Sequence, residues 1–243
     1  MRELIDLIKE SKYFVAFTGA GISTLSGIKD FRGKNGLYNS KDIDADKIFS
    51  LSYFMKDPSY FYTNSKNFIY DIDSKGPNII HKELARLEKK GILKALITQN
   101  IDMLHEKAGS ENVIEVHGSA SSHKCLSCGK KYGFDEVSVI VNDDKVPRCE
   151  NCGGIIKPEI IFFEEPLNAT SIEMAVHEAS RADLMLVLGS SLQVQPAASI
   201  PLHTLDNRGK LIIINDMETP LDRYAELKYE NLEKCFSGIA SAF

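Results

Sequence analysis

The 243-residue sequence has no apolar run that approaches the ~20 residues of a membrane-spanning helix. It has no excess of basic residues either, because 29 Lys and Arg are set against 34 Asp and Glu, which gives a formal charge of −5. This balance excludes a generally basic nucleic-acid binder, although a local basic patch stays open. The first ten residues are charged and amphipathic, and the apolar stretch at residues 13–17 is too short for a secretory signal. We therefore expect a cytoplasmic enzyme or binding protein that contacts neither nucleic acid nor a membrane directly.

Cysteine is scarce as well, and four of the five cysteines form two close pairs. Cys125 and Cys128 make one C-x-x-C motif, and Cys149 and Cys152 make a second after a spacer of 20 residues. Zn²⁺ prefers four tetrahedral thiolates, and a two-residue spacer lets one turn present both sulfurs of a pair to the same ion. The quartet therefore predicts one closed, structural zinc site, with a redox pair or an iron–sulfur cluster as the alternatives. Cys235 stands alone and is expected to be a buried apolar residue.

Four short apolar runs, at residues 13–18, 92–98, 184–188 and 211–214, each end abruptly in small or polar residues. Continuous rather than alternating apolar runs are typical of strands that are covered on both faces of a parallel sheet. Helical spacing predicts helices over 81–90, with Gly91 as the stop, over 172–180, and over 197–205 after Pro196 as an N1 proline. Strands that alternate with helices indicate a doubly wound, Rossmann-like α/β fold. In such folds the ligand binds beyond the carboxyl ends of the strands, where the polar clusters lie.

Residues 119–163 break this pattern, because they hold the cysteine quartet and several glycines but little helical periodicity. We therefore divide the chain into an α/β domain over 1–118 and 164–243 and an inserted zinc module over 119–163. The polar stretch over 31–50 is expected to be a mobile loop above the site.

Three motifs carry candidate chemistry. Gly19-Ala20-Gly21 follows the first strand and is predicted to open a helix, so that free backbone N–H groups could bind a phosphate, although the third glycine of the dinucleotide fingerprint is replaced by Thr24. Asn100 and Asp102 follow the second strand and could bind a carboxamide or merely cap the strand. His117 follows a short apolar run and could act as a general base. For the other five histidines a structural role is expected.

Read together, these motifs resemble the sirtuins, which are NAD-dependent protein-lysine deacylases. The resemblance rests on motifs in the family's order along almost the whole chain, namely GAGIS at 19–23, SGIKDFRG at 26–33, TQNID at 98–102, VHG at 116–118, the cysteine quartet, KPEIIFFEE at 157–165, GSSLQVQPA at 189–197 and Asn215.

The resemblance implies that NAD is the co-substrate, that one Zn²⁺ is structural, and that acylated lysines in proteins or peptides are the partners. It assigns catalytic roles to His117 and Asn100. The implied NAD-binding residues are Gly19, Ala20, Gly21, Thr24, Phe31, Arg32, Gln99, Asn100, Ile101, Asp102, His117, Gly189, Ser190, Ser191 and Asn215, with a further contact near residues 231–233. The implied peptide-binding residues are Ile160, Ile161, Phe163, Leu192 and Val194, between which the substrate would add as a strand.

In the implied reaction the acyl oxygen attacks C1′ of the ribose as nicotinamide leaves, His117 removes a proton from the ribose hydroxyls, and water completes the release of free lysine and O-acyl-ADP-ribose. Two alternatives remain open at this point. The same pocket could serve an NAD hydrolase or mono-ADP-ribosyltransferase, or the chain could bind NAD or acyl peptide without turnover.

The sequence also departs from the family pattern at Lys29, Leu25, Met103 and Glu164, none of which removes a reacting group. Glu164 stands where the family has glycine, and we expect it to favour basic peptides. Relatives that prefer succinyl-lysine carry Tyr-x-x-Arg where this chain has Tyr62 and Ser65, so that neutral acyl groups, acetyl or longer, are favoured.

Overall fold

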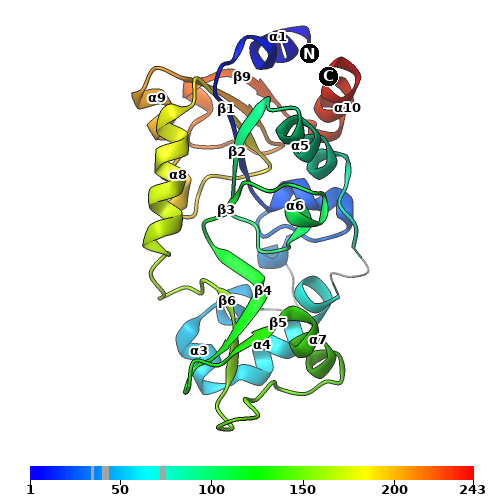
Figure 1. The fold of residues 1–243 in the computed structure, drawn as a ribbon, viewed down its shortest axis with the longest axis vertical. Helices are drawn as coiled ribbons and strands as arrows, with labels where there is room; N and C mark the ends of the chain where they lie inside the picture. Colours follow the sequence, from blue (N-terminus) through cyan, green and yellow to red (C-terminus); the bar gives the residue numbers. More distant parts are fainter. Residues whose placement is uncertain (34–35, 40–43, 72–74) are drawn as a thin grey trace.

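Two sheets of different construction organise the chain in a computed structural model that describes residues 1–33, 36–39, 44–71 and 75–243 (Figure 1). The larger sheet is entirely parallel and has the strand order β3-β2-β1-β7-β8-β9. Its strands are β1 (Phe14–Thr18), β2 (Leu93–Thr98), β3 (Val113–Glu115), β7 (Leu184–Leu188), β8 (Lys210–Ile214) and β9 (Ala225–Tyr229). The chain builds outward from β1 in one direction and from β7 in the other, so the strand order reverses between these two strands. This order confirms the predicted doubly wound fold.

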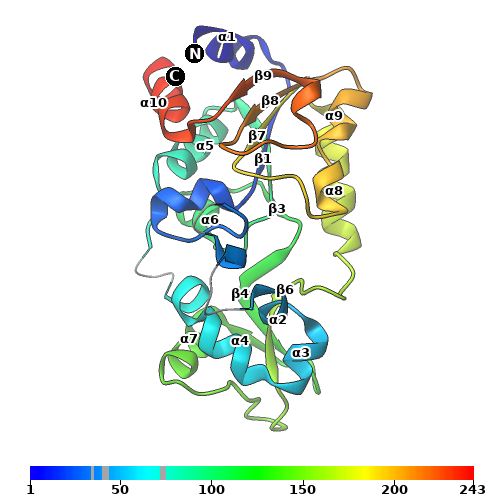
Figure 2. The ribbon, with the colours of Figure 1, turned by 180° about the vertical axis from the view of Figure 1, so that it is seen from behind.

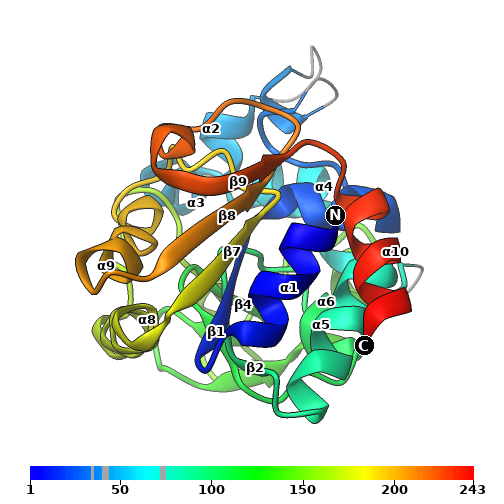
Figure 3. The same ribbon diagram turned by 90° about the horizontal axis from the view of Figure 1, so that it is seen from above.

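Helices cover both faces of this sheet, and together they form the large domain (Figure 3). One face carries α1 (Arg2–Glu10), α5 (Ile79–Lys89) and α10 (Leu232–Ala242), and the other carries α8 (Ala169–Arg181) and α9 (Leu202–Asp206). Alternate residues of one strand enter different cores, as Leu186 packs with the first group of helices and Val187 with the second. Burial on both faces explains why the four predicted strands appear in the sequence as uninterrupted apolar runs.

One helix prediction was wrong in detail. The helix expected over 197–205 is divided into a 3₁₀ turn (Ala197–Ser199) and α9, and Pro201 lies between them. Proline has no N–H to donate to the preceding turn, so one continuous α-helix is not formed. The helix predicted to open after Gly19 is present as a 3₁₀ helix (Ala20–Ser26).

The second sheet is small and antiparallel, with the order β5-β4-β6, and lies at the lower end of the molecule (Figures 1 and 2). Its strands are β4 (Gly118–Cys125), β5 (Lys131–Gly133) and β6 (Ile156–Ile160). A helix that the sequence analysis did not predict, α7 (Phe134–Asn142), follows β5. Its valines and isoleucine are β-branched residues, which favour strands over helices, so the sequence pattern did not indicate a helix. At the start of the helix, the side chain of Glu136 accepts a hydrogen bond from the Gly133 N–H.

A separate stretch of chain packs onto this small sheet. It comprises α2 (Ala45–Ile48), α3 (Leu51–Lys56), α4 (Pro58–Ser65) and a π-helical turn (Lys66–Tyr70). Apolar side chains of these helices share one buried cluster with the sheet and α7. We call this whole assembly the module. The predicted division into 1–118, 119–163 and 164–243 did not include this packing, because the helices lie far from the cysteines in sequence.

The remaining described helices are short: η2 (Leu37–Asn39), α6 (Leu104–Lys107) and η6 (Asp222–Tyr224). The loop predicted over 31–50 therefore contains η2 and α2, while residues 34–35 and 40–43 lie outside the described part of the chain. No helix within the described ranges is both long and apolar enough to cross a membrane.

Candidate active site

The floor of the site lies where the order of the large sheet reverses. Gly19 N donates to Leu188 O at 2.9 Å and Gly21 N donates to Gly189 O at 2.9 Å, so the loops that follow β1 and β7 lie against each other. A Cβ added at Gly19 would lie 2.8 Å from Gly189 O and from Ser190 Cβ. Glycine is therefore required here for close backbone approach, and the exposed backbone of the two loops can contact a ligand directly.

A hydrogen-bond network lies beyond the end of β2. Ser23 Oγ donates to Asp102 Oδ2 at 2.6 Å, and Leu104 N donates to Asp102 Oδ1 at 3.0 Å. Burial raises the pKa of Asp102, although these two hydrogen bonds oppose the shift. Asn100 Nδ2 lies 3.3 Å from Ser23 Oγ, and its Oδ1 is buried without a hydrogen-bond partner among the described residues. A buried acceptor without a partner is costly, so this oxygen marks a place where a ligand donor would be stabilising.

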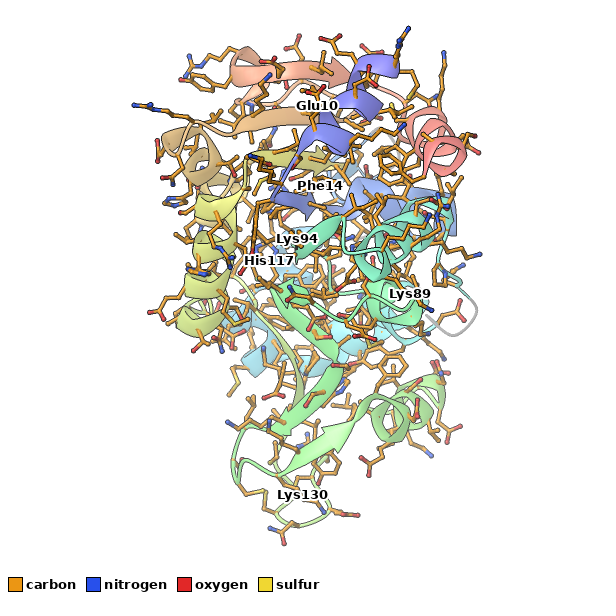
Figure 4. The ribbon with its side chains drawn as sticks, turned by 45° about the horizontal axis from the view of Figure 1, so that its top comes forward. Glu10, Phe14, Lys89, Lys94, His117 and Lys130 are labelled. Atoms are coloured by element: carbon orange, nitrogen blue, oxygen red, sulfur yellow. The ribbon has the colours of Figure 1, made fainter. Side chains whose placement is uncertain are left out.

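His117 lies where the large domain meets the module, directly before β4 (Figure 4). Its Nδ1 is 3.0 Å from the backbone oxygen of Gln99. Because a carbonyl oxygen can only accept, the neutral ring carries its proton on Nδ1 and keeps the lone pair of Nε2 available. Burial lowers the pKa of His117 below its ordinary value, although the bond to Gln99 opposes this shift, so the ring is neutral near pH 7. A neutral imidazole with a free Nε2 has the form of a general base.

One cleft of about 490 Å³ joins these groups to the upper edge of the module. Most of the predicted site residues line it: Gly19, Ala20, Gly21, Phe31, Arg32, Gln99, Asn100, Ile101, His117, Ile160, Ile161, Phe163, Gly189, Ser190, Ser191, Val194 and Asn215. Thr24, Asp102 and Leu192 are not among its lining residues, and Asp102 already binds Ser23 and Leu104. Asn231 caps α10 by accepting from Lys234 N.

Aromatic residues that the sequence analysis did not single out form part of the wall on the module side. Phe49 and Phe162 both line the cleft, and their ring centroids lie 5.9 Å apart in an edge-to-face arrangement. Phe31 extends this group, with its centroid 5.6 Å from that of Phe49. No periodic pattern in the sequence marks this group, because its members come from separate segments of the chain. Tyr62 and Ser65 are buried within the module and do not line the cleft.

An ion pair between the buried Lys157 and the partly exposed Glu165 holds the segment after β6. Lys157 Nζ lies 2.8 Å from Glu165 Oε2, donates to Ile160 O at 2.7 Å and sits 4.0 Å from the centroid of the Phe162 ring. Glu165 Oε2 also accepts from Phe162 N at 2.7 Å. Burial lowers the pKa of Lys157, and the neighbouring Glu165 opposes that shift. The pair thus connects both ends of the segment that carries the predicted peptide-binding residues.

The four paired cysteines converge at the far end of the module, as predicted. Their sulfurs all lie within 4.8 Å of one another, with 3.5 Å between Cys125 and Cys152 and 3.6 Å between Cys128 and Cys149. A tetrahedral zinc with Zn–S bonds of about 2.3 Å needs sulfurs spaced by about 3.8 Å. Four thiols with no histidine or carboxylate in the group fit a closed structural zinc site. Gly129 and Gly153, which follow the two motifs, have φ of 74° and 72°, as such turns require.

This architecture defines the class of Rossmann-like α/β proteins with an inserted metal-binding module. Comparison with known proteins identifies a family within this class. The profile of the Sir2 family matches residues 19–196. An NAD-dependent protein deacetylase of Thermotoga maritima is 46% identical over 229 residues, which is 94% of this chain and 92% of the relative. An NAD-dependent protein deacylase 2 of Archaeoglobus fulgidus is 40% identical over 94% of this chain and 89% of its own length.

Solved structures agree with these matches. A Sir2 structure described with a deacetylated p53 peptide and 3′-O-acetyl-ADP-ribose superposes with a TM-score of 0.92 at 44% identity, covering 99% of this chain and 96% of its own. Sir2Tm bound to a propionylated peptide gives a TM-score of 0.89 at 41% identity, covering 99% and 97%. The chain belongs to the Sir2 family.

Proposed function

We propose that this protein removes acyl groups from lysine side chains of proteins and consumes NAD as a co-substrate. The observation that carries the proposal is that a single cleft joins the glycine-lined strand ends, His117 and the segment 160–165. The named relatives are NAD-dependent deacetylases or deacylases, and structural neighbours are described with acetylated or propionylated peptides, which supports the same activity here.

The residues present fit NAD. The glycine loops after β1 and β7 would let the phosphates approach the backbone closely, because glycine has no Cβ. The unpartnered Asn100 Oδ1 and the backbone of Ile101 would take donors of the nicotinamide end, and Ser190, Ser191 and Asn215 would hold the adenosine half. NAD supplies the electrophilic ribose carbon, which becomes reactive as its bond to nicotinamide breaks.

His117 would remove a proton from a ribose hydroxyl through Nε2, while Gln99 O holds Nδ1–H and fixes the ring. Phe31 and Phe49 would exclude water from this position, and the apolar side chains of Ile160 and Ile161 would border the acyl-lysine chain. Ser65 stands where relatives that prefer succinyl-lysine carry an arginine after Tyr62, so acetyl and longer neutral acyl groups are the proposed substrates.

The test is an assay of an acetyl-lysine peptide with and without NAD, using the wild-type protein and His117→Ala. We expect NAD-dependent deacetylation, and a kcat that falls by about 10²–10⁴-fold in the variant, because a positioned general base is lost. Circular dichroism serves as the folding control. Deacetylation without NAD, undiminished turnover in the variant, or nicotinamide release that needs no acyl peptide would contradict the proposal.

A further inference from the structure

Glu164 has an unusual backbone conformation at the edge of the cleft. Its φ of 79° lies in the left-handed region, which a residue with a Cβ adopts only when its surroundings enforce it. The residue before it is held by the module, since Phe163 N donates to Phe49 O at 2.7 Å and Leu51 N donates to Phe163 O at 3.3 Å. The turn at Glu164 therefore begins where the chain leaves its pairing with residues 49–51.

The side chain of Glu164 binds the start of α3. Its Oε1 accepts from Ser50 Oγ at 2.7 Å and from Ser52 Oγ at 3.0 Å, and its Oε2 accepts from Ser52 N at 3.3 Å. The serine hydroxyls and the amide lower the pKa of this carboxyl group, so it stays ionised at neutral pH. The carboxylate is thus engaged within the protein even though the side chain lies at the surface.

Helix α3, whose start binds this carboxylate, packs against the core of the module. Phe54 of α3 is fully buried, and its ring centroid lies 5.4 Å from that of Phe162 and 5.5 Å from that of Phe61. The hydrogen bonds from Ser50 and Ser52 to Glu164 therefore connect Glu164 to the core of the module. Glu164 itself lines the cleft, next to Phe163 and Glu165.

We propose that Glu164 is a positioning residue for the acyl-lysine peptide: its carboxylate, bound to Ser50 and Ser52, fixes the left-handed conformation of Glu164. That turn sets the course of residues 163–165 along the side of the cleft proposed to bind the peptide. This inference rests on the proposed function. It replaces the expectation that Glu164 attracts basic peptides by its charge, because the carboxylate is directed to α3. A fixed edge binds a peptide more tightly than a mobile one, since less ordering accompanies binding.

The first experiment measures the Kd of a fluorescein-labelled acetyl-lysine peptide by anisotropy, without NAD, so that binding is observed independently of turnover. We expect Glu164→Ala to raise the Kd about fivefold and Ser52→Ala to raise it less, because the turn loses part of its preorganisation. Glu164→Gln, which keeps an acceptor oxygen, is expected to restore most of the affinity. Glu173→Ala removes an exposed glutamate of α8 that does not line the cleft and serves as the control.

Kinetics then separate positioning from general loosening of the fold. The peptide KM should rise in Glu164→Ala while the KM for NAD and kcat stay within about twofold, and the double variant with Ser52→Ala should be no worse than Glu164→Ala alone. Two peptides, one flanked by lysines and one flanked by neutral residues, should lose affinity equally.

An unchanged peptide Kd in Glu164→Ala, or a loss confined to the lysine-flanked peptide and removed by salt, would overturn the inference. A joint decline of kcat and both KM values would overturn it as well. Failure of the wild-type protein to deacylate any peptide, with peptide binding intact, would instead refute the proposed function.

Discussion

The two sides of the cleft are built from different parts of the protein. The side proposed to bind NAD, called the NAD side below, is made mainly of backbone at the ends of parallel strands, where Gly19 and Gly21 lie against Gly189. The side proposed to bind the peptide, called the peptide side below, is made of side chains, namely an aromatic group around Phe49 and the Lys157–Glu165 ion pair. Both are carried on the small module that holds the cysteine quartet. Backbone sites at strand ends follow from the fold itself, whereas the peptide side depends on long-range packing. Substitutions on one side should therefore weaken the binding of NAD or of the peptide without weakening the binding of the other.

Loss of the metal site should give the largest effect, and it should fall on the peptide side. In Cys128→Ser we expect the zinc content to drop from about one per chain to near zero, because one of the four thiolate ligands is lost. The module should then lose its order, because structural zinc contributes on the order of 10 kcal/mol to ordering a small module. Peptide binding and deacylation should be lost with it, and metal analysis with a peptide-binding assay checks this. A variant that stays folded, active and free of metal would contradict the structural role.

A methyl group added between the loops after β1 and β7 should instead weaken NAD binding. In Gly19→Ala the new methyl group would meet Gly189 O and Ser190 Cβ at 2.8 Å, so the loops must separate. We expect the KM for NAD to rise by about 5- to 150-fold, because overpacking of this kind typically costs about 1–3 kcal/mol, with the peptide Kd unchanged. Gly76→Ala is the matched control, since a Cβ there meets no atom within 4 Å. Equal effects of the two substitutions would contradict the close-contact argument.

Breaking the Lys157–Glu165 ion pair should weaken the peptide side by a smaller amount. In Lys157→Met the partly exposed Glu165 carboxylate is left without its cation, and water screens part of the resulting penalty, so the cost should lie below the about 3–5 kcal/mol of a fully buried pair. We expect lower stability in urea and weaker peptide binding, with NAD binding retained. The double variant Lys157→Met with Glu165→Gln should recover part of the stability. No recovery would show that Lys157 acts through contacts other than this pair.

Acid should weaken both domains, and the large domain more, because burial also lowers the pKa of its His105 well below the ordinary value. Burial lowers the pKa of His81, in the large domain, to about 4, and that of His123, in the module, to about 4. Between pH 6.5 and 4 the unfolded chain binds more protons than the folded protein, so stability falls as the pH decreases through this range. Each histidine should remove about 2 kcal/mol of unfolding free energy between pH 7 and pH 5. Urea unfolding at both pH values measures this, and His81→Gln should flatten the dependence. A free energy of unfolding that does not change between pH 7 and pH 5 would contradict the conclusion that these imidazole rings are buried in the neutral form.

The same contrast explains what the sequence could predict. The four strands, their parallel order and the polar residues at their ends follow from local patterns, because a fully buried strand needs a continuous apolar run. The cysteine quartet was equally clear, since metal ligands need a fixed spacing. The association of α2, α3 and α4 with the small sheet could not be predicted, because it depends on aromatic contacts between distant segments such as Phe54 and Phe162. The role of Glu164 likewise depends on Ser50 and Ser52, more than a hundred residues away.

The most direct test of the central claim, that one cleft holds both substrates beside His117, is a product balance by mass spectrometry. An acetyl-lysine peptide and NAD are incubated with the wild-type protein, and nicotinamide, deacetylated peptide and O-acetyl-ADP-ribose are quantified over time. Reaction of both substrates in one cleft predicts equal amounts of the three products at every time point. Nicotinamide formed in excess of deacetylated peptide, or free acetate in place of O-acetyl-ADP-ribose, would contradict it.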